Sequence, residues 1–146
     1  MVESLTPQSS LLWEIGAKLY ADSGEIDATL LSEQDWSAMR QAAADMRAVS
    51  LALQSAPPQV AAPGAKLQGE EGGGALSAAQ IQALIDAEPE AFAAEAGKLV
   101  EVAEGFLTAI EARDGAAIDE LSGRLNEACS ACHLRFWFPD QAAQYQ

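Results

Sequence analysis

The sequence predicts an all-α fold: an antiparallel four-helix bundle with a long loop, containing a short extra helix, between its second and third long helices. Apolar residues recur in steps of three and four in four segments, which is the spacing of one helix face. Three of these stripes keep a seven-residue period, as helices packed at shallow angles do. No segment sustains a period of two. With 146 residues, 49% of them apolar, a single domain over residues 1–146 is expected.

The first two predicted helices carry start signals. Thr6 is expected to cap the first helix, with Pro7 in its opening turn and Gly24 as a stop. Ser32 and Asp35 have the spacing of a capping box at the start of the second helix, which ends before the next Pro-Pro pair. The apolar stripes of these helices are Leu12, Ile15 and Leu19, and then Trp36, Met39, Ala43, Met46, Ser50 and Leu53.

A segment rich in Gly and Pro separates these helices from the second half of the chain. Residues 56–76 are expected to form a flexible loop, followed by the short helix over Ser77–Ala87. Pro89 begins a third long helix that ends at Asp114-Gly115, and Pro139 closes the last one. Their stripes are Phe92, Ala96, Leu99, Ala103, Phe106 and Ile110, and then Ile118, Leu121, Leu125, Ala128 and Cys132. An up-down order gathers the end of the last helix and the start of the first at one end of the bundle.

The charge balance argues against several classes of partner. The chain has 22 acidic and 8 basic residues, and its formal net charge of -14 repels phosphate backbones and anionic membrane surfaces. No apolar run reaches the roughly 18 residues that span a bilayer, and residues 1–6 lack a signal-peptide pattern. We therefore expect no nucleic-acid partner and no membrane span, and, if the protein is exported, a signal absent from this chain. The acidic surface either serves solubility or guides a partner with a basic docking surface.

Residues 129–133 read Cys-Ser-Ala-Cys-His and contain both cysteines and the only histidine of the chain. Two thiols separated by two residues can add to the two vinyl groups of a haem to form thioethers, and the next residue can place its imidazole on the iron. In a helix, Cys129 and His133 lie one turn apart on nearly the same face. The motif therefore predicts one covalent haem c, held by Cys129 and Cys132, with His133 as an iron ligand.

Three other uses of this motif are less favoured. Structural zinc needs four nitrogen or sulfur ligands, so these three candidates would require carboxylates or a second molecule. A thioredoxin-type dithiol belongs at the start of a helix after a strand, whereas this pair lies near the end of the last helix. A disulfide across two residues would strain a helix. On residues alone these alternatives stay open.

With this motif near its C-terminus, the chain resembles the class II cytochromes c, the cytochrome c′ group. The similarity includes the segment around Trp13, the Leu-Ser-Glu-Gln-Asp-Trp run at residues 31–36, the Ala/Leu-rich third helix and the aromatic run at residues 136–138. The resemblance implies an up-down four-helix bundle, a periplasmic location, haem insertion after export, and His133 on the proximal side of the iron.

The resemblance also bears on the sixth iron ligand, because some members leave this position open or blocked and others fill it with a methionine of the first helix. The first predicted helix has no methionine. Met46 lies on the inner stripe of the second helix, nearer the expected haem end than Met39, and is the candidate distal ligand if the two are not simply core residues. Trp13 and Ala17, together with Gly16, are expected beside the macrocycle, where the indole would cover it.

A cation is expected near the two propionates of a haem in such an acidic chain. Arg135, two residues after the expected iron ligand, is the first candidate, with Arg47 and Lys66 behind it. All three could equally be surface charges. Arg135 is therefore included among the predicted cofactor-binding residues.

The predicted function is one-electron transfer in the periplasm, with a redox protein as partner. The alternative is binding or sensing of a diatomic gas, NO or CO, at an open distal position, a capacity of class II cytochromes c. A peroxidase-like enzyme would need a distal acid-base group, and none is evident because His133 is the only histidine, so no enzyme activity is expected. Related bundles often dimerise through their first two helices, so a homodimer stays a possible assembly, although the net charge of -14 works against it.

Overall fold

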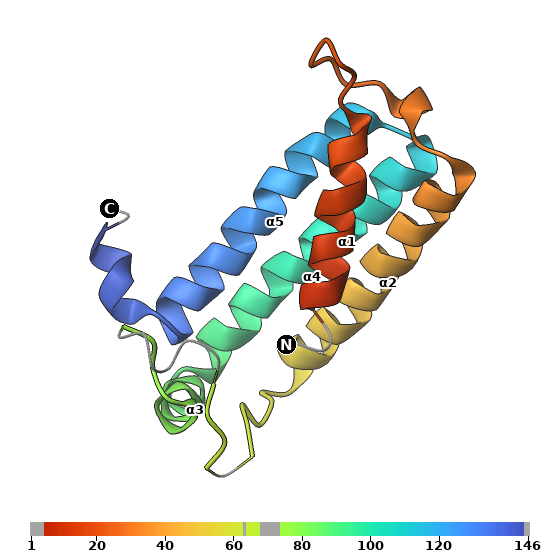
Figure 1. The fold of residues 1–146 in the computed structure, drawn as a ribbon. Coiled ribbons are helices and arrows are strands. Elements are labelled where there is room, and N and C mark those ends of the chain that lie inside the picture. Colours follow the sequence, from red (N-terminus) through yellow and green to blue (C-terminus); the bar gives the residue numbers. More distant parts are fainter. Residues whose placement is uncertain (1–4, 63, 68–73, 145–146) are drawn as a thin grey trace.

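The computed structural model describes residues 5–62, 64–67 and 74–144 of the chain. Its helices are α1 (Thr6–Gly16), α2 (Glu33–Ser55), α3 (Ala78–Ala87), α4 (Pro89–Ala112) and α5 (Gly115–Phe136), with short 3-10 helices η1 (Ala17–Leu19), η2 (Ala28–Leu30) and η4 (Pro139–Gln144) (Figure 1). Within the described ranges the only β pairing is a bridge between Tyr20 and Ile26. The predicted all-α class is therefore confirmed. None of the described helices combines the length and the apolar content needed to cross a membrane.

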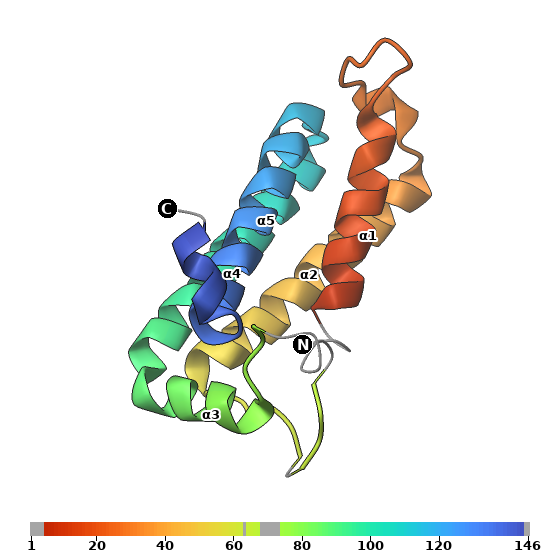
Figure 2. The same ribbon diagram turned by 60° about the vertical axis from the view of Figure 1, so that its left-hand side comes forward.

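Four helices pack along one another as in a helical bundle. Helix α2 packs against α1 and α4, and α5 packs against α4 and α1 (Figure 1). The short helix α3 lies beside one end of this group, next to α4 and α5 (Figure 2). The largest fully buried apolar side chains all belong to the predicted stripes: Leu12, Leu19, Met39, Met46, Phe106, Ile110, Ile118 and Leu125. They form the larger of two hydrophobic clusters, which we call the main core.

A second, smaller cluster fills the end at which α3 lies. Its buried members are Ile81, Ile85, Phe92 and Phe136. Described parts of the predicted loop also reach it, because the Val60 N–H donates to Gln82 Oε1 at 2.9 Å and Val60 packs on the cluster. The predicted flexibility of residues 56–76 is not tested, and residues 63 and 68–73 of that loop lie outside the described residues.

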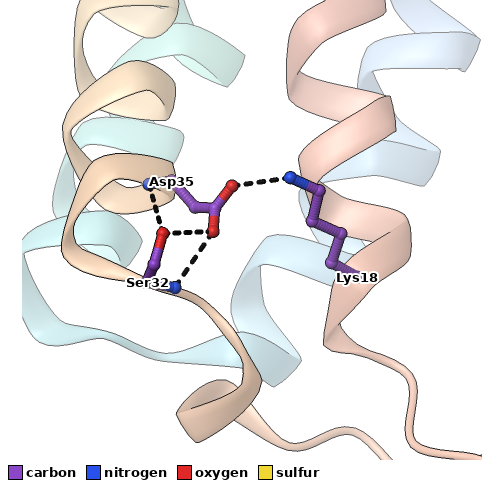
Figure 3. Close-up of polar contacts among 3 residues, drawn as sticks. All are labelled: Lys18, Ser32 and Asp35. Carbon is purple, nitrogen blue, oxygen red and sulfur yellow. Dashed lines mark hydrogen bonds and ion pairs between the residues drawn. The ribbon is translucent and has the colours of Figure 1, made fainter.

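Two capping boxes are present, and the sequence predicts the first of them. Ser32 Oγ accepts from the Asp35 N–H at 3.1 Å, and Asp35 Oδ2 accepts from the Ser32 N–H at 3.0 Å (Figure 3). These bonds satisfy backbone donors that the first turn of α2 would otherwise leave unpaired. Ser77 and Gln80 form the same reciprocal pair at the start of α3, where the sequence predicts the short helix to begin.

The start of α1 differs from the prediction. The N-cap is Leu5, which has helical backbone angles and makes no side-chain cap, so Thr6 is the first helical residue and not the cap. Pro7 lies in the first turn as expected. The Ser9 hydroxyl donates to the Thr6 carbonyl at 3.1 Å and supplies a local bond inside the helix instead.

The end of α1 also comes earlier than predicted. The α-helix stops at Gly16 and tightens into η1 instead of continuing to Gly24. Tyr20 then forms the bridge with Ile26, and its hydroxyl donates to a carboxylate oxygen of Asp119 on α5. Gly24 has a φ of 84° and forms the turn between the bridged residues. These contacts hold the chain in an extended conformation where the sequence alone predicts more helix.

Candidate functional site

The Cys-Ser-Ala-Cys-His motif lies in the last two turns of α5. Cys129, Cys132 and His133 are all half-buried, and both cysteines are free thiols. Cys129 packs against the main core, whereas Cys132 packs against the smaller cluster. The motif therefore lies on the boundary between the two clusters, where α5 can present reactive side chains to enclosed space.

An apolar pocket of about 300 Å³ adjoins the motif. Its wall contains Ser9, Ser10 and Trp13 from α1, Met46 and Leu53 from α2, Phe92, Ala96 and Leu99 from α4, and Leu125, Cys129, Cys132 and His133 from α5. Four helices thus contribute to one space. The pocket gathers the beginning of α1 and the end of α5, as the sequence predicts for the end that carries the motif.

A second pocket of about 200 Å³ lies on the α3 side of the motif. Val60 and Leu67 of the loop, together with Ile81 and Ile85 of α3, form its outer wall. Both pockets share five lining residues: Leu53, Phe92, Cys132, His133 and Trp137. His133 and Trp137 therefore border both spaces.

Burial favours the uncharged forms of the motif side chains. It raises the pKa of the Cys129 thiol, and burial together with the nearby Glu95 carboxylate raises the pKa of Cys132 to about 11. Burial also lowers the pKa of His133 below its usual 6.5. Glu95 is itself buried and pairs with Lys98 at 2.8 Å. A neutral imidazole keeps the lone pair that a metal ion needs, and burial of His133 favours this neutral form.

Trp137 is the functional candidate that the sequence analysis did not assign. Its indole meets the His133 ring edge-on, with ring centroids 5.2 Å apart. Its backbone N–H donates to the His133 carbonyl at 2.8 Å. Its Nε1 is buried and has no hydrogen-bond partner within the described part of the chain. The available signal is its spacing of four residues from His133, which puts both on one helix face.

The structure brings Met46 and Trp13 to the pocket beside the motif. Met46 is only 1% exposed and lines this pocket, whereas the equally buried Met39 lines neither pocket. Trp13 is 36% exposed, and its Nε1 donates to the Ser122 carbonyl of α5 at 3.2 Å. The indole is thus fixed across α1 and α5 at the solvent side of the pocket.

Ala17 and Arg135 are not brought to the pockets. Ala17 is exposed in η1, beyond the end of α1, because the opposite end of that helix faces the motif. Arg135 points to the start of α4, where its guanidinium donates to Glu88 Oε2 at 2.6 and 3.2 Å. Arg47, the second predicted cation, pairs with Glu104 at 2.8 Å. Both arginines are therefore engaged by surface carboxylates.

The donor set suits a haem better than a bare metal ion. Among the described residues, no three His, Cys, Asp or Glu side chains converge to hold a metal. Structural zinc needs about four protein ligands, whereas a haem iron needs only one imidazole, since the porphyrin supplies four nitrogens. Two free thiols, a neutral imidazole and an adjacent apolar pocket fit covalent haem, and the unpartnered indole N–H offers a donor to a polar group entering that space.

The chain matches no protein-family model, and comparisons with curated proteins and with solved structures also give no match. Its function is therefore inferred from the residues and geometry at the end of α5.

Proposed function

We propose that the protein is a c-type cytochrome that carries one haem c and transfers single electrons. Cys129 and Cys132 would hold the haem through thioethers, and His133 would bind its iron. The observation that carries this proposal is that both thiols and the only histidine line one apolar pocket formed by four helices. When bound, the haem supplies a one-electron couple between ferric and ferrous iron.

We infer that α1, α2, α4 and α5 form an antiparallel up-down bundle. The pocket supports this topology because its wall combines early residues of α1 and α4 with late residues of α2 and α5. Up-down connections place those segments at the same end of a bundle. The topology agrees with the resemblance to class II cytochromes c, which implies a periplasmic protein that receives its haem after export.

The chain's own residues suit electron transfer more than catalysis. Met46 brings a thioether to the pocket and is the candidate sixth ligand. Of the acid and imidazole side chains that the structure describes, only His133 lines this pocket, so no distal acid-base group and no enzyme activity are proposed. The net charge of -14 favours a redox partner with a basic docking surface and disfavours nucleic acid. We do not infer a homodimer.

A second candidate function is binding of NO or CO at an open iron. It is favoured by α1, which contributes Ser9, Ser10 and Trp13 to the pocket and has no methionine between Thr6 and Gly16. If the protein binds NO or CO, Met46 is a core residue and the gas enters the pocket beside the Cys-Ser-Ala-Cys-His motif. The spin state of the haem protein separates the two functions.

The first experiment is expression with a cytochrome c maturation system, followed by extraction with acidified solvent. Covalent haem stays with the protein, and the visible spectrum then reports the iron. The double variant Cys129→Ser, Cys132→Ser should lose covalent haem, while the matched control Ser130→Ala, inside the same motif, should retain it. Haem that extracts fully from the unmodified chain would overturn the proposal.

A further inference from the structure

Four contacts hold Trp137 in place, two of its main chain and two of its indole. The backbone N–H of Trp137 donates to the His133 carbonyl at 2.8 Å, and the Trp137 carbonyl accepts from the Leu76 N–H at 2.9 Å. The indole stacks on Phe138 at 4.9 Å between ring centroids and meets the His133 ring edge-on. Main chain and ring are therefore both restrained, so the direction of the indole N–H is set by the fold.

This N–H is a buried donor without an acceptor. An indole nitrogen can only donate, and buried polar groups are normally hydrogen-bonded. Trp13 meets this expectation through the Ser122 carbonyl, but Trp137 does not. The other such atom among the described residues is the Ser50 hydroxyl, which lines neither pocket. Trp137 lines both, so the residue that carries this unpaired donor borders the same space as Cys132 and His133.

The chemistry of a bound haem leaves one class of good acceptor for this donor. The porphyrin nitrogens are occupied by iron, and an iron-bound imidazole offers a second N–H and no lone pair. Thioether sulfurs are weak acceptors. The two carboxylates remain, and charge-assisted bonds to them are the strongest available. Two of the three cations expected to hold them pair with surface carboxylates, Arg135 with Glu88 and Arg47 with Glu104.

We propose that the Nε1–H of Trp137 donates a hydrogen bond to a carboxylate of the bound haem and so positions that side of the macrocycle. The inference rests on the proposed function, because it requires a haem in this pocket. Trp137 is a positioning residue in this scheme. It takes the place that the sequence analysis gave to Arg135.

The test uses haem-loaded protein and the variant Trp137→Phe, which keeps an aromatic ring and removes the donor. The propionate bending band in the resonance Raman spectrum should shift to lower frequency in this variant. Trp36→Phe is the matched control, because Trp36 is a buried tryptophan of the main core that lines neither pocket. An unshifted band in Trp137→Phe, or an equal shift in Trp36→Phe, would overturn the inference.

A second measurement needs no variant, in case Trp137→Phe does not mature. In reduced low-spin protein labelled with ¹⁵N-tryptophan, saturated with CO where the iron is open, the Trp137 indole N–H should resonate downfield, at the position of a donor to a carboxylate. A signal at the position of a free indole would contradict the assignment. Wild-type protein without covalent haem would remove the proposed function together with this inference, whereas covalent haem with a free indole signal would remove this inference alone.

Discussion

Lys18 and Asp35 join the turn after α1 to the first turn of α2, with Lys18 Nζ 2.7 Å from Asp35 Oδ1 (Figure 3). The other carboxylate oxygen of Asp35 accepts from the Ser32 backbone N–H. Hydrogen bonds from Lys18 and Ser32 hold the pKa of Asp35 at about 2, below its usual 3.8. One carboxylate therefore completes the α2 cap and connects it to the preceding helical segment.

Asp35 should make the free energy of unfolding decrease at acidic pH. Its pKa is lower in the folded chain, so as the pH falls from 3.8 towards about 2 the unfolded state takes up the proton first and stability is lost. Urea unfolding at pH 6 and pH 3 should show a smaller loss for Asp35→Asn than for the parent chain. Asp22→Asn, in the turn after η1, is the control. If Asp35→Asn and Asp22→Asn lose the same stability between pH 6 and pH 3, Asp35 does not have this role. Removing the cap in Ser32→Ala should cost about 1 kcal/mol at pH 6.

Replacing either of two helical glycines with alanine should have different effects on the stability of the chain. A Cβ at Gly105 would lie 2.7 Å from Leu121 Cδ2 in the buried α4–α5 contact, whereas a Cβ at Gly123 would meet nothing within 4 Å. Gly123→Ala should stabilise the chain by about 0.5–1 kcal/mol because glycine is a poor helix former. Gly105→Ala should be less stable than Gly123→Ala by about 1–3 kcal/mol from overpacking. Thermal unfolding of the two variants compares them, and equal stability would mean that the α4–α5 contact relaxes freely.

Met46 and Met39 provide a matched pair for the sixth ligand. Both are buried on α2, but only Met46 lines the pocket beside the motif. If Met46 ligates the iron, the ferrous parent protein should be low-spin and indifferent to CO, and Met46→Leu should give broad high-spin bands that shift with CO. Met39→Leu should leave the spectrum unchanged. Each swap should cost less than about 1.5 kcal/mol in stability. A parent protein that is already high-spin would favour the gas-binding function.

Arg135→Gln should leave the reduction potential unchanged. The Arg135–Glu88 pair is about half exposed on both sides, so its loss should change stability by less than about 1 kcal/mol. Glu88→Gln removes the same pair from the other side and is the control. A potential that moves in Arg135→Gln but not in Glu88→Gln would restore Arg135 as a partner of the haem carboxylates. Redox titration of the two variants decides this.

The sequence predicts the start of a helix well where residues close to one another in the chain form its cap. Ser32 with Asp35 predicted the start of α2, and the short helix predicted to begin at Ser77 has its N-cap at that residue. These starts could be predicted because a cap is a bond between residues three apart. The end of α1 could not, because it depends on the contact of Tyr20 with Asp119, 99 residues away in sequence.

The candidate site was predictable in part for the same reason. Spacing alone identified the cysteine pair and His133, and helical phase placed Met46 on the inner face of α2, next to the same pocket. Sequence spacing does not show which charged residues form ion pairs. The sequence therefore predicts Arg135 beside the haem propionates, whereas the structure pairs it with Glu88 at the start of α4. Trp137 became a candidate only when the structure showed that its indole nitrogen has no partner.

The boundary between the two hydrophobic clusters bears on the order of maturation. The main core closes without His133 or Trp137, and the smaller cluster holds the last turn of α5 and the α3 side of the motif. Loosening the smaller cluster would expose Cys132, while the main core, against which Cys129 packs, stays closed. If the proposed haem is attached here, the main core can therefore form first, and attachment is a late event confined to one end of the molecule.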